Sequence, residues 1–591
     1  MDFLPISKQD LKKRGWDTPD VILVSGDAYV DHPSYGVSVI GRVLERAGYR
    51  VGIIAQPDWK NIEAFKVLGR AGLFFGISAG NLDSMVSNYT THKRPRTKDG
   101  YSPQGKTGLR PDRATIVYAN RIREAFNDVP IVIGGIEASL RRLAHYDWWD
   151  NTVRRSILLD TRADILVYGM GESSVVEIAK RLSEGRDLNG IRGTVIVRGF
   201  ADWNLDTANC IEIPSCEEVK KDIKKFNTAF AAVYKNHDPF QGKTIIQKHG
   251  NRFVIQYPPA FPLTAQKLDK IYDIPFVKAW HPIYDKNGGV PGFQTVKFSL
   301  ISHRGCPGQC SFCSLSMHQG RIVQSRTGTS LLREARALTQ RKDFRGTISD
   351  IGGPTANLFK AYCSRWNDRG ACRERSCLTP EKCKQFHLGY RESMKVYDAI
   401  MRLPGVKHLF IESGLRYDLL IDKESDEYLE HICRNHISGQ MKVAPEHTVD
   451  HVLKIMNKPS FHRYEEFAER FRTTTKNAGK TLYPVHYIIS AHPGSTLEDA
   501  LDLSLALMKK GIYPEQIQDF IPLPMTLSGA MYHTGEHPLT GKKVYSAKTF
   551  RERKMHRALI QYRHPKNKRL AREALAILKR EDLMGRFQCR T

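Results

Sequence analysis

Seven of the eleven cysteines lie in one stretch near the middle of the chain, where they form two groups. The first group, Cys306, Cys310 and Cys313, follows a strand-like run and has the spacing C-x3-C-x2-C. Three thiolates on one short loop can bind three corners of a cube-shaped iron–sulfur cluster, because cysteine is the usual ligand of such clusters. The fourth iron would then take a small molecule, much as a catalytic zinc with three protein ligands keeps an open position. The alternative is a structural zinc site completed by His303 or His318.

The second group has the spacing C-x8-C-x4-C-x5-C and lies in a polar, basic insert. Its members are Cys363, Cys372, Cys377 and Cys383, and His387 could replace one of them. Four such thiols could bind an auxiliary [4Fe-4S] cluster or a structural zinc ion, which would supply folding energy to a segment with little core of its own. The alternative is free thiols in a flexible loop, because the spacing matches no standard pair.

The other four cysteines, Cys210, Cys216, Cys433 and Cys589, show no ligand spacing. An odd number of cysteines, bunched rather than scattered, argues against a disulfide framework and for metal chemistry in a reducing compartment. We therefore expect a cytoplasmic protein.

Composition agrees with a large globular protein. The chain has 591 residues, of which 41% are apolar and 26% charged, and a prior of about 150 residues per domain suggests three or four domains. No apolar run approaches the roughly 18 residues of a membrane span, and the first residues lack the layout of a secretory signal. The formal net charge of +27 favours anionic partners such as nucleic acid, phosphates or a cofactor.

The first part of the chain alternates short strand-like runs with amphipathic helical stretches. The runs are 21–24, 51–54, 73–78, 131–135 and 165–169. Such alternation predicts a doubly wound, Rossmann-like parallel sheet, which we assign to residues 1–200. Residues 86–112 are polar and basic and predict an exposed loop that closes on a ligand. Residues 201–290 have poor periodicity and recurring prolines (Pro258, Pro259, Pro262 and Pro282), so we interpret them as a linker or extension with one helix near 216–234.

A second alternating series starts near residue 293. Strands are expected at 296–302 and ending at Ile351, Ile411-Glu412, Val443-Ala444, 487–489 and Asp519-Phe520, with helices such as 330–340 and 464–477 between them. Six such units predict a partial (β/α)6 barrel over 291–540, with the cysteine-rich insert at 360–390, whose chemistry belongs at the carboxyl ends of its strands. Residues 541–591 carry sixteen Lys and Arg against four Asp and Glu and predict a basic helical extension.

The cysteine loop resembles the signature of the radical S-adenosylmethionine (radical SAM) superfamily, C-x3-C-x-aromatic-C, with Phe312 as the aromatic residue. This resemblance implies a [4Fe-4S] cluster on Cys306, Cys310 and Cys313 whose open iron is chelated by S-adenosylmethionine (SAM). Reductive cleavage of SAM would then give methionine and a 5′-deoxyadenosyl radical that abstracts hydrogen. It also implies an electron donor such as flavodoxin or ferredoxin.

The resemblance extends to the ends of later strands. Gly352-Gly353-Pro354 matches the family's glycine motif, which meets the methionine amino group through backbone, although Pro354 stands where many members have Glu. Glu412-Ser413-Gly414 and Ala444-Pro445-Glu446-His447 offer polar groups for the carboxylate and ribose, so Glu412, Ser413 and His447 are candidate SAM contacts. The run from Ser490 to Thr496 resembles the family's late turn beside the adenine.

Over most of its length the chain is similar to the YgiQ-type radical SAM proteins, a group without an established substrate. The similarity rests on the 31–36 motif Asp-His-Pro-Ser-Tyr-Gly, on Gln319-Gly320-Arg321, on Gln518-Asp519-Phe520 and on the basic end. The N-terminal domain also resembles cobalamin-binding domains, with Gly134-Gly135 and Gly169-Met170-Gly171-Glu172 at corresponding turns. It lacks Asp-x-His-x-x-Gly, the motif whose histidine ligates cobalt, so bound cobalamin and an empty sheet domain both stay open.

The basic C-terminal residues favour a phosphate-bearing partner. These residues are Arg551, Arg553, Lys554, Arg557, Arg563, His564, Lys566, Lys568, Arg569, Lys579 and Arg580. RNA is therefore an open candidate substrate, on charge alone, although charge runs are usually solvated faces. The competing function is a zinc-stabilised nucleic-acid-binding protein without radical chemistry.

Overall fold

The computed structural model describes residues 2–199, 209–514 and 517–588, and the α/β chain divides into two compact units. Unit 1 comprises Met1–Ile301, Met317–Leu338 and Arg365–Ala371, and unit 2 comprises Ser302–Ser316, Thr339–Ser364 and Cys372–Thr591. No helix among the described residues is long and apolar enough to cross a membrane.

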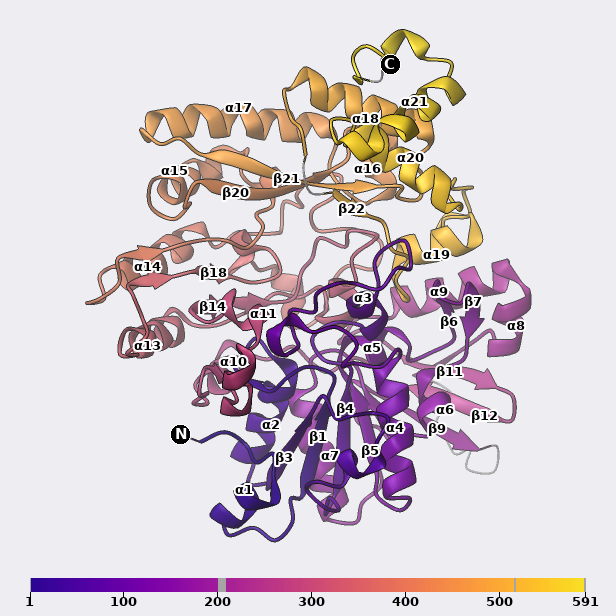
Figure 1. Cartoon of the computed structure of the whole chain (residues 1–591), viewed down its shortest axis with the longest axis vertical. Coiled ribbons are helices and arrows are strands. Elements are labelled where there is room, and N and C mark those ends of the chain that lie inside the picture. Colours follow the sequence, from indigo (N-terminus) through magenta and orange to yellow (C-terminus); the bar gives the residue numbers. More distant parts are fainter. Residues whose placement is uncertain (1, 200–208, 515–516, 589–591) are drawn as a thin grey trace. The chain divides into compact units, whose positions relative to one another are not determined.

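The parallel part of the unit 1 sheet is built from the five predicted runs. Its strands follow the order β3-β1-β4-β5-β8 (Figure 1). Their bounds are β1 (Val21–Ser25), β3 (Val51–Ala55), β4 (Phe74–Ser78), β5 (Ile131–Gly134) and β8 (Ile165–Val167). Every residue of β1 is buried, because continuous Val, Ile and Leu runs suit a parallel sheet covered on both faces.

Helices follow these strands as a doubly wound sheet requires. Helix α2 (Gly36–Arg46) packs against α7 (Glu172–Ser183), and α4 (Ala114–Ala125) packs on β4 and β5. The Rossmann-like sheet predicted from the sequence is confirmed.

The linker predicted at 201–290 is wrong, because this segment adds three strands to the same sheet. Strand β9 (Thr194–Gly199) pairs antiparallel with β8 and with β12 (Arg252–Gln256), and β11 (Thr244–His249) and β10 (Cys210–Ile213) complete nine strands. The prolines that suggested a linker follow β12 instead of interrupting it. Two helices, α8 (Cys216–Lys221) and α9 (Ile223–Lys235), replace the single predicted one.

The 86–112 segment, predicted as an exposed loop, is anchored to the rest of unit 1 by a buried arginine. Arg110 is 2% exposed and donates to Asp27 and Asp99 at 2.6 and 2.8 Å. A buried guanidinium between two carboxylates fixes this polar segment to the carboxyl end of β1.

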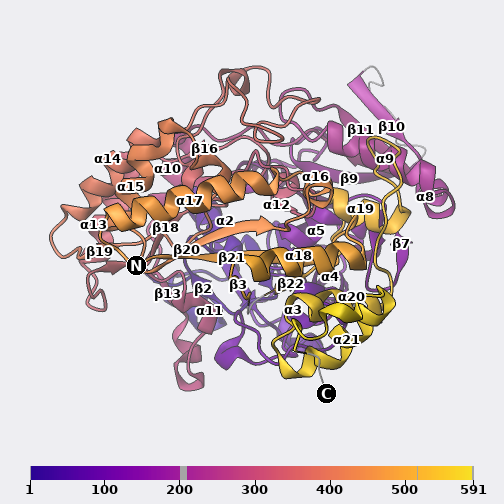
Figure 2. The ribbon, with the colours of Figure 1, turned by 90° about the horizontal axis from the view of Figure 1, so that it is seen from above.

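Unit 2 shows the predicted alternation of short parallel strands and helices. Strand β17 (Thr347–Ile348) pairs with β19 (His408–Leu409), and β20 (Gln440–Glu446), β21 (Tyr483–Ser490) and β22 (Ile517–Asp519) form a parallel sheet. Strand β18 (Asp350–Gly352) ends at the predicted glycines. The connecting helices are α14 (Tyr390–Met401), α15 (Asp426–Asn435), α17 (Phe461–Asn477) and α18 (Leu497–Lys509), and α17 runs alongside β20 and β21 (Figure 2).

Three helices close the chain: α19 (Leu527–Thr534), α20 (Phe550–Ile560) and α21 (Lys568–Ile577). Helices α20 and α21 lie in the segment predicted to be helical, residues 541–591, but they do not form a free basic tail. Leu559, Leu575 and Phe587 are fully buried in one cluster with Leu501 of α18. This apolar core fixes the C-terminal helices to the strand-and-helix part of unit 2.

Candidate functional site

The cysteine loop lies in unit 2, directly after the two-residue strand β15 (His303–Arg304). A Cβ atom added to Gly308 would lie 3.4 Å from Cys306 Sγ, 3.8 Å from Cys310 Sγ and only 2.8 Å from Arg416 Nη1. The two thiols and the guanidinium therefore converge on the one residue that has no side chain. A larger residue at this position would occupy the space between the sulfurs.

The loop is held from several directions. Ser311 donates its N–H to Met456 O and accepts from Ser528 N, each at 2.9 Å. The Ser311 and Ser528 hydroxyl oxygens are 2.7 Å apart, and Asn457 Nδ2 donates to Gln309 O at 2.9 Å. Ser528 belongs to α19, so a helix more than two hundred residues away in sequence fixes the backbone between two of the cysteines.

Burial raises the pKa of the Cys306 and Cys313 thiols, the latter to about 12, and the neighbouring cysteines add to this rise. Arg416 opposes the shift at Cys306. Because thiolates are the metal-binding form, a cation must displace these protons when it binds. The site thus favours neutral thiols as long as no metal cation is bound.

Arg416 places a fixed positive charge beside the sulfurs. It is buried, donates to Asp418 at 2.7 Å and has Nη1 3.9 Å from Cys310 Sγ. The Asp418 carboxylate and the thiols hold the pKa of Arg416 above its usual value. No spacing pattern marks this residue, which lies 106 positions from Cys310.

The predicted glycine motif is crowded by its neighbours. A Cβ on Gly352 would lie 2.4 Å from Ser413 Oγ, and one on Gly353 would lie 2.6 Å from His303 Cε1. The Gly352 carbonyl already accepts from the backbone N–H and hydroxyl of Ser302 at 2.7 and 2.9 Å. The close approach of these groups explains why both positions are glycine.

Asp350, which the sequence analysis missed, joins the ends of two strands. It accepts from the backbone N–H groups of Glu412 and Ser413 at 2.8 and 2.9 Å and from Ser413 Oγ at 2.5 Å. These bonds draw Glu412 and Ser413 out of the strand predicted to end there, so β19 already ends at Leu409. Burial raises the pKa of Asp350.

The Glu412 carboxylate is engaged away from the cysteines. It accepts from Lys442 Nζ at 3.0 Å and from Ser438 Oγ at 2.8 Å. Glu412 and Ser413 therefore lie together as predicted, but their side chains are already bonded to protein groups.

The end of β20 carries two buried titratable groups. Glu446 has a left-handed backbone (φ 67°), and burial raises its pKa to about 7 against the opposing charge of Lys458. His447 is 1% exposed; its Nδ1 accepts from Val449 N, so a neutral ring donates from Nε2 to Ser495 Oγ, 3.3 Å away. Burial lowers the pKa of His447 to about 3.

The predicted late turn meets the cluster loop through His492. The His492 ring lies 5.9 Å from that of Phe312 in an edge-to-face contact. Its Nδ1 is 2.7 Å from Pro493 O and its Nε2 is 2.7 Å from Ser528 Oγ. The neighbouring strands are joined by Ser490 Oγ, which donates to Asp519 at 2.5 Å.

The second cysteine group lies in unit 2 as a loop closed at its neck. Tyr362 and His387 exchange backbone hydrogen bonds of 3.0 and 2.9 Å, and Cys383 N donates to Cys377 O at 2.8 Å. Within the described residues, no three His, Cys, Asp or Glu side chains gather as ligands around one metal position. Cys589 lies outside the described residues.

Much of the predicted basic surface is engaged internally. Arg553 is 1% exposed and donates to Phe520 O, Arg557 pairs with Asp519 at 2.8 Å and Arg551 with Glu573 at 2.7 Å. The predicted basic residues that are exposed, apart from the paired Arg551, are Arg563, His564, Lys566, Lys568, Arg569 and Lys579.

Comparison with known proteins identifies the class. A family model described as Radical SAM N-terminal matches residues 3–299, and one described as Domain of unknown function (DUF3362) matches residues 515–589, starting before the basic extension predicted at 541. The protein is a radical SAM enzyme, as the signature of the cysteine loop predicted.

Two curated relatives cover almost the whole chain. A UPF0313 protein of Clostridium botulinum is 49% identical over 588 residues, which is 99% of this chain and 92% of the relative. A UPF0313 protein of Methanocella arvoryzae is 48% identical over 584 residues, 98% of this chain and 96% of the relative. The chain belongs to the UPF0313 family.

Solved structures give a more distant match. The radical SAM methyltransferase TsrM from Kitasatospora setae, solved with cobalamin and a [4Fe-4S] cluster bound, is 16% identical with a TM-score of 0.48, covering 86% of this chain and 74% of its own. The cobalamin-dependent radical SAM enzyme OxsB, solved with aqua-cobalamin, is 11% identical with a TM-score of 0.47, covering 90% and 58%.

Proposed function

We propose that Cys306, Cys310 and Cys313 hold three irons of a [4Fe-4S] cluster and that SAM binds the fourth. The observation that carries this proposal is the convergence of two of these thiols on Gly308, within a loop that presents only three. The donor set fits the group, because each thiolate would take a different iron and the loop leaves one iron without a protein ligand. When bound, the cluster and SAM together supply one-electron reductive cleavage of the sulfonium to a 5′-deoxyadenosyl radical.

In this proposal the surrounding residues position the cluster and exclude water. Arg416 offsets the negative charge of the thiolates, and its own charge is balanced by Asp418. The Ser528 and Met456 contacts hold the backbone at Ser311, so the loop keeps its shape when the thiols lose their protons.

We assign the SAM contacts by what each predicted residue has left to offer. Phe312 and the Gly353 backbone stand as direct contacts. His447 acts through position, because its Nδ1 accepts from Val449 N and its Nε2 donates to Ser495 Oγ. Gly352 and Ser413 act through position, because Ser302 occupies the Gly352 carbonyl and Asp350 occupies the Ser413 hydroxyl. Glu412 remains a contact through its backbone carbonyl only.

Cobalamin is not part of the proposal, because the residues present do not fit a cobalt-ligating histidine. His32 directly follows Asp31, is 0% exposed and accepts from Ser34 N at its Nδ1, 3.1 Å away. The reductant that we propose is an external one-electron carrier of the flavodoxin or ferredoxin class. RNA as substrate and a cytoplasmic location stay expectations from the sequence.

We also propose a second metal site on Cys363, Cys372, Cys377 and Cys383, holding either an auxiliary [4Fe-4S] cluster or zinc. What supports it is four thiols within a loop closed at its neck by Tyr362 and His387. The insert already buries Trp366, Leu378 and Phe386, and a bound metal would add to the stability that this burial gives it.

The experiment that tests the main proposal compares wild type with Cys310→Ala after anaerobic reconstitution with iron and sulfide. We expect the wild type to convert SAM to 5′-deoxyadenosine with dithionite, and the variant to lose both this activity and the cluster's electron paramagnetic resonance signal. Cys433→Ala is the matched control, because Cys433 is fully buried and shows no ligand spacing. Retained cleavage in Cys310→Ala, or stoichiometric zinc in place of iron, would refute the proposal.

A further inference from the structure

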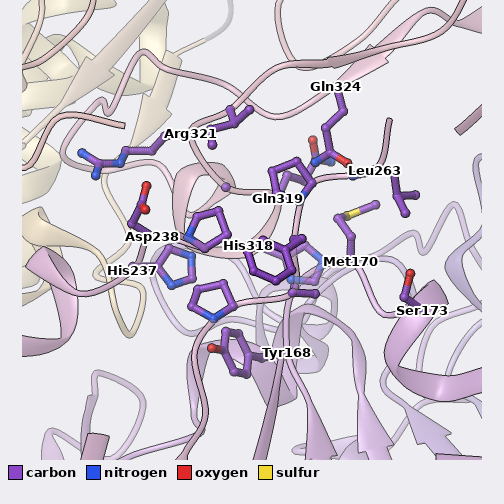
Figure 3. Close-up of a pocket in the computed structure, with 18 residues that line it drawn as sticks. Tyr168, Met170, Ser173, His237, Asp238, Leu263, His318, Gln319, Arg321 and Gln324 are labelled. Carbon is purple, nitrogen blue, oxygen red and sulfur yellow. Dashed lines mark hydrogen bonds between the residues drawn. The ribbon is translucent and has the colours of Figure 1, made fainter. Parts of the chain in front are cut away.

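A cavity lies within unit 1 beyond the carboxyl end of β8, and the proposed radical chemistry assigns it no role (Figure 3). The space between the lining residues, together with the open solvent at its mouth, amounts to about 660 Å³. Its wall combines apolar residues such as Met170 and Phe261 with Tyr168, His237 and Arg321. The cavity can therefore take a molecule with an apolar body and at least one polar group.

A buried cation without a counter-ion lies behind this wall. Arg142 is 0% exposed and donates from Nε to Gln256 Oε1 and from Nη1 to Ser139 O, both at 2.6 Å. Its Nη2 has no hydrogen-bond partner among the described residues, and the two acceptors, an amide oxygen and a backbone carbonyl, carry no formal charge. The guanidinium stacks on the ring of Tyr168, 4.6 Å from its centroid, so one aromatic ring separates the charge from the cavity.

Burying an arginine without an anion is unfavourable. Other buried arginines of unit 1 have carboxylates: Arg42 pairs with Asp31 and Arg110 with Asp27 and Asp99. Arg142 thus differs from its neighbours in the fold, and an anion in the adjacent cavity would remove the imbalance.

His237 supplies an unused polar atom in the wall of the same cavity. It is 7% exposed, its ring lies 6.1 Å from that of Tyr168, and its buried Nδ1 has no partner in the part of the chain that the structure describes. Burial and the charges of Arg142 and Arg321 keep this ring neutral by lowering its pKa. A neutral imidazole can donate one hydrogen bond to a ligand oxygen.

The acidic side chain that lines the cavity is bonded to backbone groups of the chain. Asp238 accepts from the backbone N–H groups of Phe240 and Gln241 at 2.9 Å and from that of Ala371 at 2.8 Å. Glu172, in the first turn of α7, is not among the lining residues. The Asp238 carboxylate is thus already bonded within the chain, whereas His237 keeps a ring nitrogen for a ligand.

We infer that this cavity binds a small organic anion, a carboxylate or a phosphate monoester, with an apolar or aromatic body. The anionic group balances the charge of Arg142 and accepts a hydrogen bond from His237, and the body packs on Met170 and Phe261. This binding does not depend on the iron–sulfur cluster.

The test is calorimetric titration of the full chain with three probes that share one ring: phenyl phosphate, benzoate and phenol. We expect at least one of the two anions to bind saturably, with an affinity about tenfold or more above that of phenol. The comparison of phenyl phosphate with benzoate tells a phosphate site from a carboxylate site. Equal binding of phenol, or no saturable binding of either anion, overturns the inference.

Two variants locate the binding. We expect His237→Leu to weaken the affinity for the anion about tenfold, because the variant loses one hydrogen bond from a neutral donor. His249→Leu should leave that affinity unchanged. His249 is the matched control, since it is also buried in unit 1 with an unpartnered Nδ1. Arg142→Met abolishes the preference for anion over phenol, and if this variant does not fold, the His237 and His249 pair still decides the question. Equal effects of the two histidine variants contradict the assignment.

Discussion

At the scale of single residues, the site depends on the absence of a side chain at Gly308 and on the positive charge of Arg416. Gly308 leaves room for two sulfurs and a guanidinium, and Arg416 reaches them from a turn that follows a different strand. A positive charge fixed by Asp418 costs no reorganisation when the thiols ionise.

We expect Gly308→Ala to lower cluster content and 5′-deoxyadenosine formation about tenfold or more, because the new Cβ would be 2.8 Å from Arg416 Nη1 and would push the guanidinium or a thiol out of place. Iron and sulfide analysis with an activity assay on reconstituted protein measures this. Gly36→Ala is the control, because a Cβ there meets nothing within 4 Å and its φ is ordinary. Full activity in Gly308→Ala would show that the convergence at Gly308 does not matter.

The cysteine spacing was sufficient to predict the class of chemistry, and the family comparison confirms it. Arg416, Asp350 and Ser528 could not be predicted, because each reaches the site from a distant part of the chain and no local pattern marks it. The role of Glu412 as a side-chain contact could not be judged either, because its partners Lys442 and Ser438 are brought close only by folding.

At the scale of elements, the C-terminal helices are part of the site instead of an appendage to it. Helix α19 bonds to the cluster loop through Ser528, and α20 packs on α18. Both lie within the DUF3362 match. Arginines that the sequence suggested for phosphate binding, such as Arg553 and Arg557, instead join α20 to β22 and the residue after it.

Helix α20 also buries His556, 0% exposed, with neither ring nitrogen bonded among the described residues. Burial lowers the folded pKa of His556 to about 4, from 6.5. Its neutral form is favoured in the folded state, so stability is full above the unfolded pKa of 6.5 and falls as pH drops toward 4, where the unfolded chain binds the proton first. At about pH 5 this costs about 2 kcal/mol.

The free energy of unfolding of the wild type should fall between about pH 7.5 and about pH 5. In His556→Leu this fall should be smaller by about 2 kcal/mol. Urea unfolding of cluster-free protein at both pH values measures the difference. His564→Leu removes an exposed histidine nearby and should leave the pH dependence as in wild type. An unchanged pH dependence in His556→Leu would mean that this ring is already satisfied, for example by water.

At the scale of the whole molecule, alternating hydrophobic runs predicted the parallel strands of unit 1 and the strands of unit 2. They did not predict where the unit 1 sheet ends. Residues 244–256 form β11 and β12 of the unit 1 sheet, and the prolines that follow them led to the linker prediction. Pairing partners far apart in sequence, such as β9 with β12, decide where a sheet ends, and a single sequence does not record them. The net charge of +27 overstates the free positive surface, because many arginines are paired internally.

The two cysteine groups predict a molecule with two separable metal sites. Replacing Cys363, Cys372, Cys377 and Cys383 by Ala should remove the metal of one site, iron or zinc, and leave the electron paramagnetic resonance signal of the other. Elemental analysis of anaerobic protein measures this, and it also tells zinc from a second cluster. Replacement of Cys210, Cys216 and Cys433 is the control. Unchanged metal content in the fourfold variant would identify those cysteines as free thiols.

The interleaving of the two units has a consequence for biosynthesis. Unit 1 takes its last segment from Arg365–Ala371, after the chain has already contributed Ser302–Ser316 and Thr339–Ser364 to unit 2. A nascent chain on the ribosome cannot complete its first unit until residue 371 has emerged, by which time the cluster loop has been translated. No single cut in the chain separates the two units, so neither can be produced alone as one uninterrupted segment.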